Sequence, residues 1–371
     1  MRCKNALLFV DGQFRRGGFT VENGVFTEVT PGDTAGEDLH GAAVLPGFID
    51  LHIHGCDGSD FSDGDLAGLA AMGRFLAARG VTAFCPTAMA LPYEALEVAI
   101  TNARCLSDNL PADCAAVAGV HMEGPFLSPK KAGSQNPAYL QTPDVFAARR
   151  LYNLSGGLLR LVDAAPELEN AAALARELSP FCTVAAAHSN ADYDTAAAFF
   201  DAGGTHVTHL FNAMSPLHHR EPGILAAAAE RDKVTAELIC DGLHVHPAAV
   251  RLAFRLFPGR LCLISDALRC CGLPDGAYDL SGQTVQLQGG VAKLPDGTLA
   301  GSAVTLADCV RRAVSFGIPK EEAILAATAV PSKILGLDKR FGSIAVGKQA
   351  DFLLCDEKLN IQKVCLRGNF L

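Results

Sequence analysis

The amino-acid sequence predicts an α/β protein: a (β/α)8 TIM-type barrel with a small β-sandwich domain built from both chain termini. After Pro46-Gly47, short apolar runs alternate with alanine-rich helical stretches, which gives eight strand–helix units. Strands covered on both faces have nearly continuous apolar runs, and strand–helix alternation implies a parallel sheet. The 371 residues, of which 49% are hydrophobic, fit one barrel of about 250 residues with a small second domain.

The two chain ends have β character. Residues 6–10 (ALLFV) and 17–30 (GGFTVENGVFTEVT) are short strand candidates, with turn signals at Asp11-Gly12 and Asn23-Gly24. Residues 342–371 again have the pattern of short β-strands, and we expect them to pair with the N-terminal strands. The predicted domains are therefore residues 1–46 with 340–371 for the sandwich and residues 47–339 for the barrel.

Each barrel strand is predicted from an apolar run and each helix from an alanine-rich stretch that follows it. The predicted strands are 48–54, 81–87, 115–125, 158–167, 182–189, 205–214, 234–244 and 260–267. The predicted helices are 66–79, 93–107, 169–179, 193–202, 222–231, 247–257, 305–316 and 320–335. Residues 275–304 form an insertion with a hairpin signal at Pro295-Asp296-Gly297.

Composition excludes several classes of protein. A net charge of −9 argues against non-specific binding of nucleic acid. No apolar stretch approaches the roughly 20 residues that span a bilayer, and the N-terminus has no cleavage pattern of a signal peptide. We expect a cytoplasmic protein without a nucleic-acid or membrane partner. The thirteen cysteines contain no CxxC pair, which favours buried reduced thiols, although a reactive thiol at Cys270 or Cys271 stays open.

Polar side chains stand at the carboxyl ends of six predicted strands, where barrel enzymes place their catalytic groups. A single histidine at a strand end is more often structural than a ligand. His52 and His54, however, share one face of their strand, and Asp266 after LCLIS needs a cation or a proton partner. The full set is His52, His54, Glu123, His188, His209, His244 and Asp266. Together these residues predict a metal centre at one mouth of the barrel.

The residue types limit the metal. Imidazole and carboxylate ligands suit Zn²⁺, Fe²⁺, Co²⁺ or Mn²⁺ better than Ca²⁺ or Mg²⁺. Such an ion lowers the pKa of bound water to about 7 and polarises a carbonyl group. The sequence therefore predicts metal-assisted hydrolysis.

Several motifs resemble a known family. The stretch LPGFIDLHIHG resembles the first strand of the amidohydrolase superfamily, whose barrel carries a small sandwich built from both chain ends. The chain further resembles the N-acetylglucosamine-6-phosphate deacetylases in HMEGPFLSPKKAGSQNP, AAHSNA, THLFNAM, REPG, DGLHVHP, SDA and LAGSAVT. These motifs cover nearly the whole chain in the family order. HxH alone is moderately specific, whereas HMEGPF with THLFNAM and DGLH is highly specific.

The resemblance implies a role for each strand-end residue. Glu123, His188 and His209 would hold one metal, and His52 and His54 match a pair that helps to hold a second metal in some members. One or two divalent ions per subunit are therefore expected, with Zn²⁺ or Fe²⁺ first and Co²⁺ or Mn²⁺ as alternatives. Asp266 matches the general acid/base of the family.

The resemblance also implies residues that bind a phosphorylated amino sugar. Arg220 matches the phosphate-binding arginine, and a guanidinium fork suits phosphate geometry; without the resemblance Arg220 would be assigned to the surface. Residues 299–301 match a loop that closes over the sugar. The implied set is Ser134, Gln135, Asn212, Ala213, Arg220, Asp241, Gly242, Leu243, His244, Leu299, Ala300 and Gly301. The histidines left without a role are His40, His121, His206, His218, His219 and His246.

Gln135 departs from the family pattern. Many members have a histidine at this position that is thought to hydrogen-bond the acetyl carbonyl of the substrate. Glutamine donates a hydrogen bond but cannot become cationic. We hypothesise that Gln135 keeps the positioning role and that a second metal, held by His52 and His54, supplies more of the polarisation of the carbonyl.

The resemblance implies hydrolysis of the N-acetyl amide of N-acetyl-D-glucosamine 6-phosphate to D-glucosamine 6-phosphate and acetate. Three alternatives remain: a deacetylase for the galactosamine epimer, another amidohydrolase acting on a cyclic amide or a base, and a barrel that binds without catalysis. The resemblance further implies a homodimer, in which a residue of the neighbouring subunit reaches the phosphate.

Overall fold

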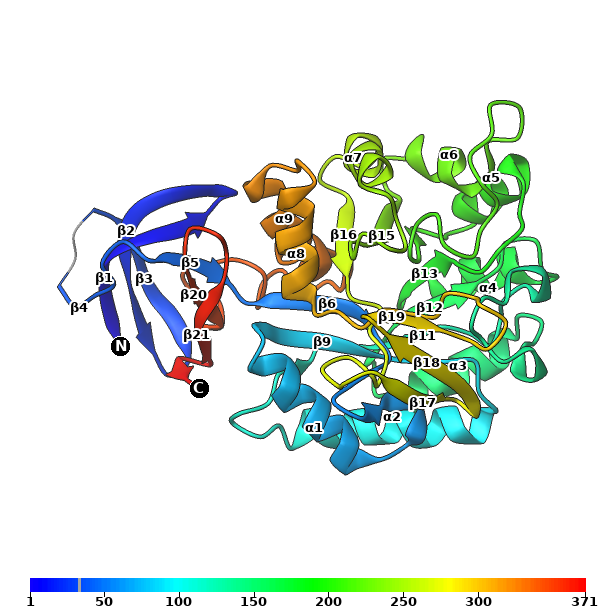
Figure 1. Ribbon diagram of the computed structural model, residues 1–371, viewed down its shortest axis with the longest axis horizontal. Coiled ribbons are helices and arrows are strands. Elements are labelled where there is room, and N and C mark those ends of the chain that lie inside the picture. The colour runs from blue at the N-terminus through cyan, green and yellow to red at the C-terminus, as the bar shows by residue number, and fades with distance from the viewer. Residues whose placement is uncertain (33–34) are drawn as a thin grey trace.

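The computed structural model describes residues 1–32 and 35–371, so residues 33 and 34 of the predicted sandwich lie outside the description. Figure 1 shows two parts, with a small sheet that contains both chain ends on the left and a barrel with its helices on the right. This is the predicted fold class. Among the described residues, no helix is long and apolar enough to cross a membrane.

The small sheet is mixed and joins the two ends of the chain. Its strand order is β22-β21-β20-β5-β1-β2-β3, with β4 paired to β1. The strands are β1 (Arg2–Val10), β2 (Gln13–Glu22), β3 (Val25–Pro31), β4 (Glu37–Asp38), β5 (Ala43–Pro46), β20 (Phe352–Cys355), β21 (Ile361–Leu366) and β22 (Asn369–Phe370). Asp11 and Gly12 turn between β1 and β2 with φ values of 51° and 73°, the left-handed backbone that an Asp-Gly hairpin turn requires.

The small sheet folds over onto its own apolar side chains. Phe19 on β2 and Phe352 on β20 make an edge-to-face contact with ring centroids 5.1 Å apart. Three strand spacings separate β2 from β20, which would be about 14 Å in a flat sheet. The sheet must therefore curl to enclose this core, as the predicted sandwich requires.

The barrel strands are parallel and follow one another in chain order around the barrel. They are β6 (Phe48–Ile53), β9 (Val81–Ala88), β10 (Ala116–Val117) with β11 (Val120–Met122), β12 (Leu159–Ala164), β13 (Thr183–Ala186), β14 (His206–Val207), β15 (Thr235–Ile239) and β16 (Leu261–Ile264). Each lies inside a predicted run except β9, which extends one residue beyond its run to Ala88. The barrel closes where the Asp266 amide, just after β16, donates to the His52 carbonyl of β6 at 2.9 Å. Closure brings all the carboxyl ends of the strands to one mouth.

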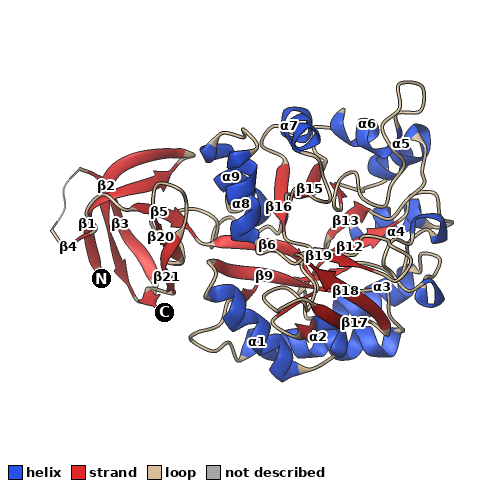
Figure 2. Ribbon diagram, viewed as in Figure 1, coloured by secondary structure: helices blue, strands red, loops and turns tan. Residues whose placement is uncertain are grey.

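Helices cover the outside of the barrel, as Figure 2 shows in blue. They are α1 (Leu66–Ala77), α2 (Tyr93–Asp108), α3 (Val145–Leu154), α4 (Ala171–Leu178), α5 (Tyr193–Asp201), α6 (Gly223–Ala229), α7 (Pro247–Leu256), α8 (Leu306–Ser315), α9 (Lys320–Ala326) and α10 (Ala329–Ile334). Three short 3₁₀ helices (Phe61–Asp63, Pro129–Lys131, Pro137–Tyr139) and the small pair β7 (Gly55–Cys56) and β8 (Ser59–Asp60) lie in loops.

Two helical details differ from the sequence prediction. Helix α3 was not predicted, because only Ala148 and Leu151 are buried on it and its apolar stripe is correspondingly weak. The predicted helix 320–335 is divided between α9 and α10. Pro331 has no N–H to donate to the carbonyl of Ala327, four residues earlier, and the helix is interrupted there.

The insertion after β16 forms a three-stranded antiparallel sheet of β17 (Gly276–Leu280), β18 (Gln283–Gln288) and β19 (Val291–Lys293). Its apolar face packs against Met89 and Leu268, which follow β9 and β16. Ala300 belongs to the same buried cluster. The insertion thus fixes the 299–301 loop at the mouth of the barrel.

Candidate metal centre and active site

The predicted residues at the strand ends lie together at the mouth of the barrel. His52 lies in β6 and His54 directly follows it. The others lie within two residues of the ends of β11, β13, β14 and β16: these are Glu123, His188, His209 and Asp266. All six side chains are buried. His188, His209 and Asp266 have positive φ values of 42°, 30° and 48°. Non-glycine residues in such backbone cost about 1–3 kcal/mol each, and this strain is typical of functional sites.

One set of ligand atoms surrounds an oxygen of Glu123. Its Oε1 lies 3.0 Å from Nε2 of His188 and 2.9 Å from Nε2 of His209, and these two nitrogens are 3.2 Å apart. Nδ1 of His188 donates to the Lys131 carbonyl at 2.8 Å, so the neutral ring presents a lone pair at Nε2. Two nitrogens and one oxygen converge on a single point, which fits a divalent ion.

A second set lies on the other side of Glu123. Nε2 of His54 is 3.2 Å from Nε2 of His52, 3.3 Å from Oδ1 of Asp266 and 3.2 Å from Oε2 of Glu123. The far nitrogens are fixed, because Nδ1 of His54 donates to the Thr87 carbonyl at 3.1 Å and Nδ1 of His52 lies 2.9 Å from Oε2 of Glu237. Both rings therefore direct Nε2 to the mouth, as metal-ligating histidines do.

The carboxylates at this site stabilise positive charge on the neighbouring imidazoles. Burial lowers the pKa of His54, but its contacts with Asp266 and Glu123 outweigh burial and raise the pKa to about 10. Burial likewise opposes the charge of Glu123, yet His52 and the bonds from His188 and His209 hold the pKa of Glu123 well below its ordinary value. A metal would replace protons on these rings, so binding is expected to weaken as the pH falls.

Six of the twelve predicted substrate residues line the cavity above these candidate ligands. The cavity has a volume of about 280 Å³. Its described lining includes every candidate ligand except His52, together with Ser134, Asn212, Ala213, His244, Leu299 and Gly301. Asp241 lies below His244 and holds its Nδ1 at 2.7 Å. Ala300 is buried, whereas Gly242 and Leu243 are exposed beside His244.

Two predicted substrate residues lie elsewhere. Arg220 is exposed, outside the described lining of the cavity, and its guanidinium bonds His219 Nε2 at 2.8 Å. Gln135 is buried, and its amide is paired inside the protein with Ala90 and Glu123. The structure thus brings the ligand residues together, but it places neither Arg220 nor Gln135 against the space above them.

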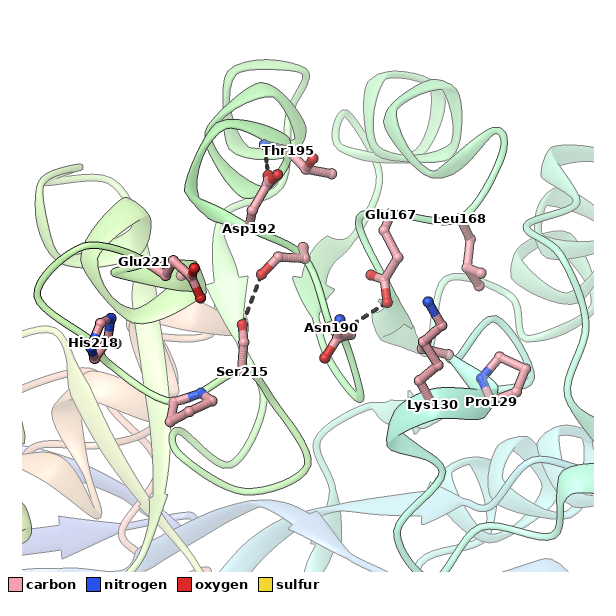
Figure 3. A pocket seen from close by; sticks show the side chains of 14 residues that line it. Pro129, Lys130, Glu167, Leu168, Asn190, Asp192, Thr195, Ser215, His218 and Glu221 are labelled. Carbon is pink, nitrogen blue, oxygen red and sulfur yellow. Dashed lines mark hydrogen bonds between the residues drawn. The ribbon is translucent and has the colours of Figure 1, made fainter.

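A larger cavity of about 750 Å³ lies beside the mouth (Figure 3). It is lined by residues such as Lys130, Asn190 and Ser215 and by none of the candidate metal ligands in the described chain. Figure 3 shows Glu167 accepting from the Asn190 amide at 2.7 Å, and the Ser189 hydroxyl also donates to Glu167 at 2.5 Å. Glu167 therefore anchors the loop that begins at His188, whereas the candidate metal ligands converge on the smaller cavity.

The sequence analysis missed a buried polar layer beneath the mouth. Glu237 bonds His52, and its Oε1 lies 3.2 Å from Nε2 of His206. His121, which was left without a role, pairs with Asp163 at 2.9 Å. The sequence did indicate this layer, because Asp163 and Glu237 each interrupt an apolar strand. The prediction missed it because it used only the polar residues at the ends of the strands. A carboxylate inside a barrel strand should have been read as a partner for a histidine.

The cysteines are reduced thiols, and all but Cys105 are buried. Burial raises the pKa of Cys271 to about 12, so its reactive thiolate is scarce at neutral pH. The prediction of buried reduced thiols is confirmed, and Cys270 and Cys271 take no part in the cavity.

Comparison with known proteins agrees with this site. A family model described as "Amidohydrolase family" matches residues 43–371. The N-acetylglucosamine-6-phosphate deacetylase of Bacillus subtilis (strain 168) is 38% identical over 334 residues, which cover 88% of this chain and 84% of that protein. The N-acetylgalactosamine-6-phosphate deacetylase of Escherichia coli O157:H7 is 34% identical over 352 residues and covers 94% of this chain and 93% of that protein.

Solved structures give the same assignment. A mutant N-acetyl-D-glucosamine-6-phosphate deacetylase from Mycobacterium smegmatis, in complex with N-acetyl-D-glucosamine-6-phosphate, matches with a TM-score of 0.94 and 32% identity and covers 100% of this chain and 98% of that chain. The enzyme from Thermotoga maritima matches with a TM-score of 0.90 and 30% identity and covers 100% of this chain and 99% of that chain. The chain therefore belongs to the amidohydrolase family and, within it, to the N-acetylglucosamine-6-phosphate deacetylases.

Proposed function

We propose that the protein is a metal-dependent hydrolase that cleaves the N-acetyl amide of N-acetyl-D-glucosamine 6-phosphate to D-glucosamine 6-phosphate and acetate. One observation carries this proposal: the Glu123 carboxylate lies between two histidine pairs, and Asp266 lies beside one of them in the same cavity. The names of the most similar relatives and the sugar bound to the Mycobacterium smegmatis enzyme support the choice of substrate.

Two groups of residues would hold the metal. Glu123, His188 and His209 would bind one ion, and His52 and His54, with Asp266 and the second oxygen of Glu123, offer a place for another. Each subunit is thus proposed to hold one or two ions, with Zn²⁺ or Fe²⁺ the best matches to this ligand set and Co²⁺ or Mn²⁺ also suitable. A bound ion of this kind polarises the carbonyl of the substrate and makes water more acidic.

Asp266 is the proposed general acid/base. Burial raises the pKa of its carboxyl, but His52 and His54 outweigh burial and hold the pKa below its ordinary value, so the group is ionised at neutral pH. The carboxylate accepts a proton from the water that attacks the acetyl carbon. It then donates that proton to the amide nitrogen, because an unprotonated amine is a poor leaving group. Proton transfer of this kind contributes about 10²–10⁴-fold to the rate.

The sugar is proposed to lie in the cavity beside His244, Asn212 and the 299–301 loop. Asp241 accepts from Nδ1 of His244, which leaves Nε2 of that ring available to a sugar hydroxyl or phosphate oxygen. Arg220 is proposed to bind the 6-phosphate, and in the proposed homodimer its exposed position would allow it to serve a neighbouring subunit. The homodimer and the cytoplasmic location stay predictions that sedimentation and cell fractionation would test.

Deacetylation of the galactosamine epimer is the second candidate. It is favoured by the 34% identity to the Escherichia coli O157:H7 relative over 94% of this chain. The two substrates differ at one sugar hydroxyl, so the metal chemistry would be the same for both.

An acetate-release assay tests both candidates. The protein is supplied with either 6-phosphate epimer or with unphosphorylated N-acetylglucosamine, before and after chelation and again after Zn²⁺ is restored. We expect rapid release from the glucosamine derivative, weak release without the phosphate, and loss on chelation that Zn²⁺ reverses. Failure of the metal-loaded protein to release acetate from either phosphate would contradict the proposal, and a preference for the galacto epimer would favour the second candidate.

A further inference from the structure

The side chain of Gln135 is enclosed between two fixed partners at the edge of the metal centre. Its Oε1 accepts from the Ala90 amide at 2.8 Å, and its Nε2 donates to Oε2 of Glu123 at 2.6 Å. Nε2 also donates to the sulfur of Met89, with 3.7 Å between the nitrogen and the sulfur. Gln135 is only 2% exposed. The neighbours Gly133 and Ser134 line the active-site cavity, but among the described lining residues Gln135 is absent.

These partners fix which way the amide faces. A backbone N–H can only donate, so the carbonyl oxygen of Gln135 must face Ala90. The NH₂ group must then face Glu123, whose ionised carboxylate can only accept. A flipped amide would set donor against donor and acceptor against acceptor in a buried place, at a cost of about 1–3 kcal/mol for each unpaired group. The amide therefore has no free donor for the acetyl carbonyl of a substrate.

Gln135 hydrogen-bonds Oε2 of Glu123, and metal binding needs this oxygen in a defined position. Oε1 of Glu123 lies between His188 and His209, whereas Oε2 lies 3.2 Å from Nε2 of His54. Without a restraint, the carboxylate can rotate and give both oxygens to one ion. The short bond from Gln135 prevents that rotation, and it keeps one oxygen directed to each histidine pair.

We propose that Gln135 is a positioning residue that orients Glu123 between the two histidine pairs, rather than a contact to the acetyl group of the substrate. The proposal rests on the metal centre of the proposed function and assigns its bridging carboxylate an orienting partner. Partners of this kind raise metal affinity about 10–100-fold, because the ligand is already oriented when the ion arrives.

The test measures metal affinity with no sugar present. Metal-free wild type and the variant Gln135→Met are titrated with Zn²⁺ in competition with a chromophoric chelator, and with Co²⁺, whose absorption spectrum reports the coordination geometry. Methionine keeps the length of the side chain but cannot donate to Glu123, and its sulfur is only a weak acceptor for the Ala90 amide. We expect Zn²⁺ affinity to fall about 10–100-fold and the Co²⁺ spectrum to change.

A matched control separates ligand orientation from general loosening of the loop. Gln283 donates to the Ser134 carbonyl at 2.8 Å, so Gln283→Met removes a hydrogen bond from the same loop without touching Glu123. We expect this variant to bind Zn²⁺ as the wild type does. An equal loss of affinity in both variants would overturn the proposal, because the effect would then come from loop order.

Two further outcomes are decisive. Wild-type Zn²⁺ affinity in Gln135→Met with a raised KM for the sugar phosphate would overturn the proposal in favour of a substrate contact. Gln135→Leu is the second variant if Gln135→Met does not fold, and failure of both to fold would assign Gln135 to loop structure instead. Since the titration contains no sugar, a loss of Zn²⁺ affinity would support the proposal even if the acetate-release assay failed.

Discussion

Glu237 holds His52 in the interior of the barrel: Oε2 of the carboxylate lies 2.9 Å from Nδ1 of the imidazole, although 185 positions separate the two residues. Both side chains are fully buried. The same oxygen accepts from the His209 amide at 3.2 Å. Burial raises the pKa of Glu237, but His52 and His206 outweigh burial and hold the pKa well below its ordinary value. One ionised carboxylate thus supports candidate ligands from β6 and from the loop after β14.

The first prediction concerns this carboxylate. Glu237→Gln removes the negative charge that orients His52, and we expect affinity for the ion at the His52–His54 pair to fall about 10–100-fold. The number of Zn²⁺ ions retained per subunit after dialysis measures the effect. Thr235→Val is the control, because Thr235 bonds His206 at 2.6 Å and does not contact His52. Equal Zn²⁺ retention in wild type and Glu237→Gln would show that Glu237 has no orienting role.

The second prediction concerns the proposed general acid/base. Asp266→Asn cannot accept a proton, so we expect kcat to fall about 10²–10⁴-fold while Glu123, His188 and His209 still bind their ion. Single-turnover acetate release and metal analysis of the same sample measure both effects. Asp163→Asn is a matched control, since Asp163 is also buried but bonds His121 and Thr208 below the cavity. Near-normal turnover in Asp266→Asn would rule out the assigned role.

The third prediction concerns the phosphate. Arg220→Met should raise KM for the 6-phosphate sugar with little change in kcat, because hydrogen bonds to a charged group contribute about 1.5–3 kcal/mol to binding. The unphosphorylated sugar should react equally well with wild type and variant. Arg251→Met, at an exposed arginine of α7, controls for the loss of one positive charge. An unchanged KM would show that another residue binds the phosphate.

The fourth prediction concerns pH and the small sheet. Asp351 accepts from the Arg367 amide at 2.7 Å and from Gln349 at 2.6 Å, but burial outweighs these bonds and raises its pKa above the ordinary value. An acid with a raised folded pKa stabilises the fold at low pH. That stability is lost as the pH rises from the unfolded pKa through the folded pKa.

Asp351→Asn removes this dependence. We expect the free energy of unfolding of the variant to improve relative to wild type as the pH rises above about 4, the ordinary pKa of an aspartate, by about 1.4 kcal/mol for each unit of pKa shift. Urea unfolding at several pH values measures the difference. Glu357→Gln, at an exposed carboxylate in the same part of the chain, changes the net charge equally and should show no such trend. Parallel pH profiles for wild type and Asp351→Asn would contradict the prediction.

Local sequence pattern predicted the repeating framework but missed α3. The eight strands were predicted correctly because a parallel strand that is buried on both faces consists of consecutive apolar residues, which are visible in the sequence. Helix α3 has only two buried residues, so its sequence has little periodicity to detect. The interruption before α10 was detectable from Pro331, whose missing N–H was not taken into account.

By itself, the sequence determined the barrel, the small sheet from both ends, and the set of strand-end histidines and carboxylates that meet at one mouth. These follow from burial patterns along the chain and from the rule that parallel strands end on one side. Only the tertiary structure decided which atoms pair: Glu237 with His52, and Gln135 with Glu123 instead of the open cavity. The physical reason is that a hydrogen bond forms only within about 3 Å, and closure of the barrel decides which distant side chains come that near.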